Sequence, residues 1–327
     1  MQQRRIGKGL LVSELCLGTM FFGTTVDEAT AFAVLDRFAE AGGNFIDTAN
    51  CYSFWTEHGT GDESESLIGR WLRRRGDRDR FVIATKVGAR PKPPGARLPE
   101  GAEGLSAEVI RAQAEASLRR LGTDHIDLYY AHIDDPNVPQ EETLGAFNEL
   151  VTAGTARVVG CSNYTTDRLI SARRMATARG WPAYQCVQQR HTYLTPVTDA
   201  DFGGQVIADE ELFEYARGEA DLTVLAYSPL LSGSYVRADR PIPPEYRHPG
   251  TADRLAAVHE VAESVEATAN QVVLAWLLGG DPQVLPVIGV SSVAQLDECL
   301  CTEDLTLDEP HRYRLDAAGQ PFTARLD

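Results

Sequence analysis

Residues 44–52 read NFIDTANCY, a stretch that begins as a buried β-strand and ends in polar side chains. Asp47 comes two residues after Phe45, so in a strand both side chains point to the same face. A lone carboxylate on an apolar face is unfavourable unless a partner compensates its charge. The stretch therefore predicts a strand whose last side chain, Asp47, has a cationic partner, with Tyr52 in the loop that follows.

Seven other apolar runs of strand length occur along the chain, and helix-like segments separate them. The predicted strands are residues 15–20, 44–49, 81–87, 126–133, 156–163, 186–190, 222–230 and 284–290. Segments 26–43 and 106–122 carry apolar residues at helical spacing and end in glycine, as helices commonly do. Similar helical segments are 139–153, 166–178, 209–219, 252–267 and 293–300. Buried strands that alternate with helices indicate parallel βαβ units.

Eight such units in 327 residues predict a single (β/α)8 TIM barrel domain over residues 1–327. An open dinucleotide-binding sheet would carry the turn G-x-G-x-x-G after its first strand, and that motif is missing. Residues 5–12, with a turn at Gly7–Lys8–Gly9, predict an N-terminal β-hairpin that closes the barrel floor. Two stretches rich in proline and glycine, 88–105 and 231–250, are too long for ordinary connections and are candidate site loops.

The composition excludes several classes of protein. With 43% hydrophobic and 24% charged residues, a globular protein with a large core is expected. No apolar run approaches the ~20 residues that span a bilayer, and the N-terminus does not resemble a signal peptide, so we expect a cytoplasmic protein. The net charge of −16 argues against a nucleic-acid partner. The six cysteines include no C-x-x-C pair, which indicates ordinary thiols and no metal site.

Polar residues end three neighbouring predicted strands. Asp47, Lys86 and His132 each follow, by two positions, an apolar residue on the same strand face. In a (β/α)8 barrel the active site lies at these C-terminal strand ends. We therefore expect the three side chains to meet at one rim, with Tyr52 beside them and with Lys86 as the partner of Asp47.

This combination predicts proton transfer. A lysine ammonium beside Tyr52 is expected to lower the phenol pKa from about 10 by roughly 1–3 units, while Asp47 orients the lysine. Such a tyrosine can donate a proton to a carbonyl oxygen as hydride reaches the carbon, and His132 would hydrogen-bond the same oxygen. Taken singly, each residue also has a purely structural interpretation; their joint placement favours a catalytic site.

On these residues the sequence resembles the aldo-keto reductase superfamily, whose members are NAD(P)H-dependent (β/α)8 barrels. The resemblance covers nearly the whole chain and is nearest to bacterial members and to potassium-channel β subunits. It rests on RRIGKGLLVSELCLGTMFFG (4–23), GGNFIDTANCY (42–52), ATKVG (84–88) and DLYYAHIDD (127–135), and on GDESESLIGRWLR (61–73), which resembles the second helix of the family. It implies that Asp47, Tyr52, Lys86 and His132 form the catalytic tetrad of the family.

The resemblance also implies a cofactor site. VVGCSNY (158–164) is similar to the segment whose Ser162 and Asn163 hold the nicotinamide carboxamide, and Tyr227 would stack on the nicotinamide ring. The backbone after Tyr227 would contact the pyrophosphate, and the N-terminus of the helix that begins near Ser291 would bind a phosphate. The implied cofactor contacts are Thr19, Met20, Asp47, Ser162, Asn163, Gln188, Tyr227, Ser228, Leu230, Gly233, Arg247, Gly289, Ser291, Gln295 and Glu298.

The chain departs from the family pattern at several positions. Many relatives have an arginine near Ser291, or a lysine where this chain has Ser234, and these cations bind the 2′-phosphate that distinguishes NADPH from NADH. Loop 231–250 offers substitutes in Arg237, Arg240 and Arg247, so we expect NADPH, with NADH as the alternative. Cys299 replaces a usual asparagine, and residues 190–191, Arg–His, replace the usual Glu–Tyr.

The expected reaction is reduction of an aldehyde or ketone to an alcohol. Candidate walls of an apolar or aromatic substrate pocket are Phe21, Phe22, Phe54, Trp55 and Tyr193. One alternative is an NADPH-binding regulatory or interaction protein with little turnover, like the channel β subunits. Another is a Schiff-base lyase with Lys86 as nucleophile, which an adjacent Asp47 disfavours because it stabilises the ammonium form. No sequence feature sets the oligomeric state.

Overall fold

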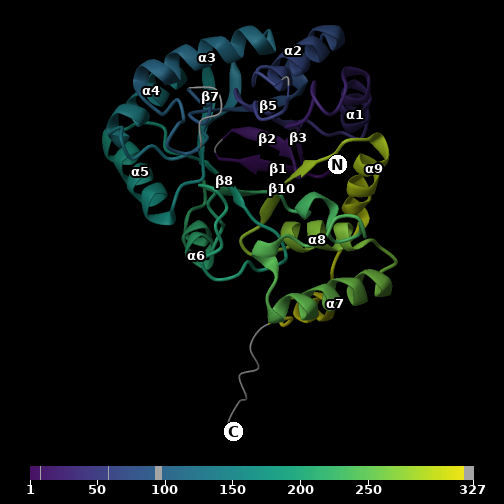
Figure 1. The fold of residues 1–327 in the computed structure, drawn as a ribbon. Helices are drawn as coiled ribbons and strands as arrows, with labels where there is room; N and C mark the ends of the chain where they lie inside the picture. The colour runs from purple at the N-terminus through teal and green to yellow at the C-terminus, as the bar shows by residue number, and fades with distance from the viewer. Residues whose placement is uncertain (8, 58, 93–97, 320–327) are drawn as a thin grey trace.

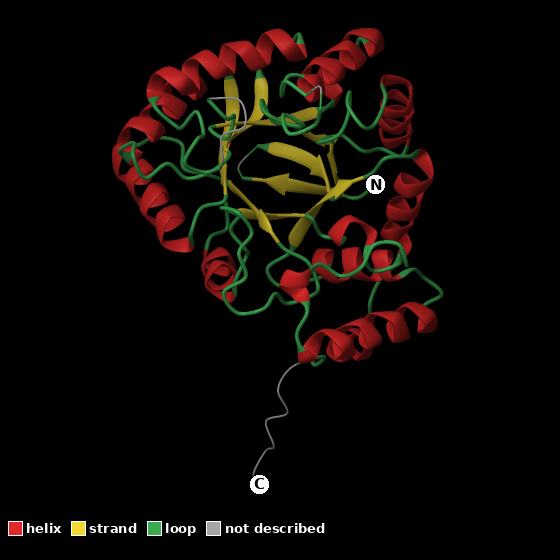
Figure 2. Ribbon diagram, viewed as in Figure 1, coloured by secondary structure: helices red, strands yellow, loops and turns green. Residues whose placement is uncertain are grey.

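In the computed structural model, which describes residues 1–7, 9–57, 59–92 and 98–319, eight parallel strands close into a barrel (Figures 1 and 2). The strand order around the barrel is β10-β3-β4-β5-β6-β7-β8-β9. Their bounds are β3 Cys16–Gly18, β4 Phe45–Asp47, β5 Val82–Val87, β6 Ile126–Ala131, β7 Ala156–Ser162, β8 Cys186–Arg190, β9 Thr223–Tyr227 and β10 Val284–Gly289. Each lies within a predicted strand, and the predicted (β/α)8 TIM barrel is confirmed.

Helices form a ring outside the strands (Figure 2). The α-helices are α1 Glu28–Glu40, α2 Glu63–Arg75, α3 Ala107–Leu121, α4 Gln140–Thr152, α5 Thr166–Arg179, α6 Glu210–Gly218, α7 Pro249–Ser264, α8 Ala269–Leu278, α9 Val293–Leu300 and α10 Glu309–Asp316. Short 3₁₀ helices are η1 Arg78–Arg80, η2 Leu231–Gly233, η3 Pro244–Tyr246 and η4 Cys301–Asp304. None of the helices in the described residues has the length and apolarity that a membrane crossing needs.

The predicted helices are confirmed, with one shift in register. Helix α7 starts and ends three residues before the predicted segment 252–267, because His248 caps it and Pro249 takes the first helical position. Helices α8 and α10 were not predicted. Nearly every residue of α8 is buried, so it lacks the one-sided apolar stripe that marks a surface helix.

The predicted hairpin is present at the N-terminus, and Lys8 of its predicted turn lies outside the described residues. Strand β1 (Gln3–Ile6) pairs antiparallel with β2 (Leu10–Ser13), and Figure 1 shows both strands across the barrel in the view along its axis. Ile6, Leu10 and Val12 belong to the same buried cluster as the side chains that fill the barrel interior. The hairpin therefore closes the barrel floor with apolar side chains.

Apolar side chains of the barrel interior precede the polar residues at the ends of β4, β5 and β6. Phe45 on β4, Val82 and Ala84 on β5, and Leu128 and Tyr130 on β6 all belong to this interior cluster. In the strand register Asp47 lies opposite Ala84, and Lys86 lies opposite Tyr130. Side chains alternate between the two faces of each strand. The inward-facing residues that follow this apolar cluster, Asp47 on β4 and Lys86 on β5, therefore lie at the C-terminal rim of the barrel.

Gly160 on β7 leaves no room for a side chain. A Cβ at this position would lie 2.7 Å from the Tyr130 ring and 2.9 Å from the carbonyl oxygen of Cys186. We expect Gly160→Ala to lower the free energy of unfolding by about 1–3 kcal/mol through overpacking, as measured by urea denaturation. Gly218→Ala, whose Cβ would have open space among the described atoms, is the control. Equal stability of the two variants would contradict the close packing at Gly160.

Candidate active site

Asp47, Tyr52 and Lys86 meet at the C-terminal ends of β4 and β5. Lys86 Nζ donates to Asp47 Oδ2 at 2.5 Å, to the Tyr52 hydroxyl at 2.6 Å and to the Thr48 carbonyl at 2.8 Å. The Tyr52 hydroxyl in turn donates to Asp47 Oδ2 at 3.1 Å. Each ammonium proton of Lys86 thus has an acceptor, and the predicted Asp47–Lys86 pair is confirmed.

The two charges of this group are shielded from water, and Tyr52 is the least buried of its three residues. The side chains of Asp47 and Lys86 are fully buried, and Tyr52 is only half-buried. Asp47 Oδ1 also accepts a hydrogen bond from Gln188 Nε2 at 2.9 Å. Because both carboxylate oxygens have donors, the buried charge is compensated on all sides, and Tyr52 is the member of the group that keeps some exposure to solvent.

The predicted direction of the Tyr52 pKa shift is wrong. Burial and the Asp47 carboxylate raise the pKa of the Tyr52 hydroxyl well above its ordinary value. The Lys86 charge does not reverse this effect, because the carboxylate that contacts Lys86 also contacts the phenol. The Tyr52 hydroxyl therefore keeps its proton at neutral pH, as a proton donor must before it reacts.

His132 follows β6 and lies beside Tyr52. Its backbone is fixed on both sides, since its N–H donates to the Val87 carbonyl at 2.8 Å and its carbonyl accepts from Asn163 Nδ2 at 2.9 Å. The rings of His132 and Tyr52 meet edge to face, with centroids 6.0 Å apart. Burial and the nearby Lys86 charge lower the pKa of His132 well below its usual value, so the imidazole is neutral at pH 7.

Residues expected to hold the nicotinamide lie next to this group. Ser162 at the end of β7 donates its hydroxyl to the Gln188 carbonyl at 2.7 Å. Asn163 Nδ2 donates to Ser162 Oγ at 3.1 Å, and the hydroxyl of Tyr227, on β9, donates to Asn163 Oδ1 at 2.7 Å. Because Gln188 also contacts Asp47, a single hydrogen-bond network joins these residues to the Tyr52 site.

The loop after β9 has an unusual backbone. Ser228, Leu231, Ser232 and Gly233 have φ values of 55°, 46°, 56° and 91°, in the left-handed region. Such conformations are unfavourable for residues other than glycine and cluster at functional sites. Successive backbone N–H groups in such turns can form concavities that bind anions. The loop is therefore suited to a phosphate-bearing ligand.

Other predicted contacts occupy the same end of the barrel. Thr19 Oγ1 donates to the Asp47 carbonyl at 2.9 Å, so its side chain fixes β4. Ser292 caps α9, and Gln295 Oε1 accepts from the N–H of Ser291 at 2.8 Å. Glu298 accepts hydrogen bonds from Thr268 and Asn270. Arg247 is exposed and donates Nε to the Ile242 carbonyl at 2.6 Å, at the edge of a hollow of about 480 Å³.

Only part of the predicted substrate pocket is available to a ligand. Phe21 and Trp55 are 38% and 50% exposed, and their rings lie 6.4 Å apart. The Phe54 ring packs on Trp55 at 5.0 Å. Phe22 and Tyr193, each 1% exposed, lie in the core instead, and their prediction as pocket walls is wrong. Phe22 packs in the core cluster that contains the α1 side chains, and the Tyr193 hydroxyl donates to the Leu315 carbonyl.

Some residues of the site were not predicted. The carboxylate of Glu103 is buried and accepts from Asn50 Nδ2 at 2.7 Å and from the Gly88 N–H at 2.8 Å. These bonds tie the candidate loop 88–105 to the segment that carries Tyr52. Cys51 Sγ lies 3.6 Å from His132 Nδ1. The one signal in the sequence was the length of loop 88–105, which does not identify Glu103.

The structure explains the Arg–His pair at positions 190 and 191. The Arg190 guanidinium stacks on Phe202, 4.5 Å from the ring centroid, and donates Nε to the Tyr246 hydroxyl at 3.0 Å. Arg190 therefore connects the loop after β8 to η3, in loop 231–250. His191 is held in an aromatic cluster against Phe213 and Trp276.

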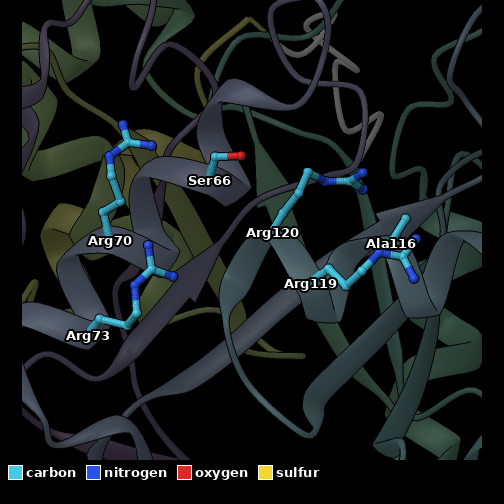
Figure 3. A pocket seen from close by; sticks show the side chains of 6 residues that line it. All are labelled: Ser66, Arg70, Arg73, Ala116, Arg119 and Arg120. Atoms are coloured by element: carbon cyan, nitrogen blue, oxygen red, sulfur yellow. The ribbon is translucent and has the colours of Figure 1, made fainter.

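A second hollow, of about 390 Å³, lies on the helical ring between α2 and α3. Figure 3 shows that arginines dominate its lining and that their head groups point in different directions. Arg70 is paired with Glu28, and Arg120 is paired with the buried Glu65. This hollow is separate from the strand ends where Tyr52 and Lys86 meet.

Comparison with known proteins identifies the class to which this barrel and rim belong. The model of the aldo/keto reductase family matches residues 14–319. The chain therefore belongs to the aldo/keto reductase family and is an NAD(P)H-dependent oxidoreductase.

Individual relatives cover most of the chain. Norsolorinic acid reductase stcV of Emericella nidulans is 33% identical over 94% of this chain and 78% of its own length. The uncharacterized oxidoreductase YrpG of Bacillus subtilis is 33% identical over 92% of this chain and 90% of its own. Aldo-keto reductase str7 of Strobilurus tenacellus is 31% identical over 94% of this chain and 88% of its own.

The rim residues fit a nicotinamide dinucleotide. Tyr227 is partly exposed at the end of β9, where a ring could stack on it. Ser162, Asn163 and Gln188 carry hydroxyl and amide groups, the types of group that can hydrogen-bond a carboxamide. The left-handed loop after β9 suits the diphosphate, as described above. The Tyr52 hydroxyl belongs to the same network as these groups.

Proposed function

We propose that this protein reduces an aldehyde or ketone to an alcohol, with Tyr52 as the proton donor. The observation that carries this proposal is the position of the Tyr52 hydroxyl. It lies 2.6 Å from Lys86 Nζ and 3.1 Å from Asp47 Oδ2, and Tyr52 keeps some exposure to solvent whereas the side chains of both charged residues are fully buried. Aldehydes or ketones with an aromatic or apolar group are the favoured substrates, because Phe21 and Trp55 are exposed on the rim loops.

The arrangement accounts for each part of the reaction. A nicotinamide held beside Tyr227 would supply a hydride, and with it two electrons, to the carbonyl carbon. Tyr52 gives its proton to the carbonyl oxygen as that oxygen becomes an alkoxide. The Lys86 ammonium stabilises the phenolate that remains, in a site that is largely closed to water. Asp47 holds Lys86 in place, and an N–H of His132 donates to the same substrate oxygen.

The alternatives are less consistent with this geometry. A Schiff-base lyase needs a free amine at Lys86, but all three protons of Nζ are donated to Asp47, Tyr52 and Thr48. A regulatory protein that binds the cofactor without turnover needs no tyrosine hydroxyl bonded to a buried ammonium. Oxidation of NADPH and NADH with a panel of aromatic, aliphatic and sugar carbonyls tests the proposal. Tight cofactor binding without turnover of any substrate would favour the regulatory role.

We further propose NADPH as the preferred cofactor, with Arg247 as the residue that binds its 2′-phosphate. Arg247→Ala is expected to raise the Kd for NADPH about 10-fold and to leave the Kd for NADH nearly unchanged, because a charge-assisted contact to the phosphate is lost. Fluorescence titration measures both constants. Arg237→Ala is the control, since that guanidinium is already paired with Asp239 at 2.6 Å. Equal weakening of both cofactors would contradict the role of Arg247.

A further inference from the structure

Cys51 is next to Tyr52 in the chain and touches His132 in space. Its thiol is 2% exposed, and Sγ lies 3.6 Å from His132 Nδ1, within reach of a sulfur hydrogen bond. The other ring nitrogen, Nε2, has no protein partner among the described residues. His132 therefore has one nitrogen against a buried thiol and one that is free for a substrate.

A neutral imidazole carries one N–H, and the position of that proton decides what His132 can do. With the proton on Nε2, the ring donates a hydrogen bond to a carbonyl oxygen that gains negative charge. With the proton on Nδ1, the lone pair of Nε2 would face that oxygen and repel it. In many proteins a carboxylate or a backbone carbonyl fixes the choice by accepting from Nδ1. Here the group at Nδ1 is the Cys51 thiol.

The thiol favours the Nε2–H form. Sulfur is a weak acceptor, whereas the unprotonated imidazole nitrogen is a good one, so S–H donating to Nδ1 is the better of the two bonds. Burial also raises the pKa of the Cys51 thiol to about 12, so the thiol retains the proton that it donates. Hydrogen bonds between the His132 backbone and Val87 and Asn163 hold the imidazole ring beside the Cys51 sulfur.

We propose that Cys51 is a positioning residue that donates its thiol proton to Nδ1 of His132 and so keeps the imidazole in the Nε2–H form that binds the substrate oxygen. This role rests on the proposed carbonyl reduction. It concerns the proton of His132 and requires no contact between Cys51 and the substrate.

The test combines NMR with kinetics. In protein labelled with ¹⁵N-histidine, the His132 signals are assigned by comparison with His132→Gln, and their shifts show which ring nitrogen is protonated. We expect Nε2–H in the native protein and in Cys51→Ser, which keeps a donor. Cys51→Ala should give a mixture of tautomers and a kcat about 3- to 10-fold lower, as for the loss of one hydrogen bond. Its melting temperature and cofactor Kd should stay close to those of Cys51→Ser.

The control is Cys161→Ala, which removes a buried thiol on β7 that belongs to the hydrophobic cluster of Tyr129 and Phe147. It should leave the His132 signals unchanged. A native protein with an Nδ1–H imidazole, or a Cys51→Ala variant with pure Nε2–H and full kcat, would overturn the proposal. The two failures are distinguishable. If the native protein turns over no carbonyl, the proposed reduction is refuted, whereas turnover with an Nδ1–H imidazole refutes only the role of Cys51.

Discussion

Replacing Tyr52 with phenylalanine is expected to lower kcat about 100-fold or more, in line with the loss of a general acid. Phenylalanine keeps the ring, which packs against His132 and lies 4.7 Å from Lys86 Nζ, and removes only the hydroxyl. Cofactor binding should therefore change little. Steady-state kinetics with the best carbonyl of the panel measure kcat, and fluorescence titration measures the cofactor Kd.

Tyr129→Phe is a matched control on β6. The Tyr129 hydroxyl is fully buried, with no hydrogen-bond partner among the described residues, and its ring packs on Phe147 in the outer core. Removing this hydroxyl should leave kcat nearly unchanged. If Tyr52→Phe also turned over substrate at the native rate, Tyr52 would not be the proton donor.

Replacing Lys86 with methionine is expected to abolish most activity and to lower the free energy of unfolding by about 3–5 kcal/mol. Methionine is similar in length but leaves the fully buried Asp47 carboxylate without its cation. Removing one partner of a buried pair is costly because the remaining charge has no compensation. Urea denaturation and steady-state kinetics of the variant measure the two effects.

A double variant separates stability from chemistry. Asp47→Asn combined with Lys86→Met removes both charges, so it should recover much of the lost stability. Its kcat should stay low, since no cation remains to stabilise the phenolate. A Lys86→Met protein as stable as the native one would show that the Asp47 charge is compensated by other groups, such as Gln188.

The fold and the position of three polar residues at the strand ends were predictable from the sequence for one physical reason. A strand buried on both faces is a short apolar run, so a polar residue at its end is conspicuous, as Asp47, Lys86 and His132 are. The alternation of side chains along each strand then assigns these residues to one face. The apolar residues below them on β4, β5 and β6 do fill the barrel interior.

Features that depend on loop packing were not predictable. Phe21 and Phe22 are adjacent and chemically identical, yet one is exposed and the other is in the core. The direction of the Tyr52 pKa shift was mispredicted because it depends on burial, and sequence spacing gives no burial. Arg190, the last residue of β8, stacks on Phe202 in the loop that follows, a contact that no periodicity encodes.

The hairpin at the barrel floor makes the dielectric environment of the tetrad asymmetric. The interior cluster below Asp47 and Lys86 is apolar and is closed off by Ile6, Leu10 and Val12, so solvent polarisation acts mainly from the rim. Charges in such a place are weakly screened on their inner side. Dissolved salt, which reaches the group from one direction only, should therefore weaken the Asp47–Lys86 attraction far less than it weakens the ion pairs on the outer helices.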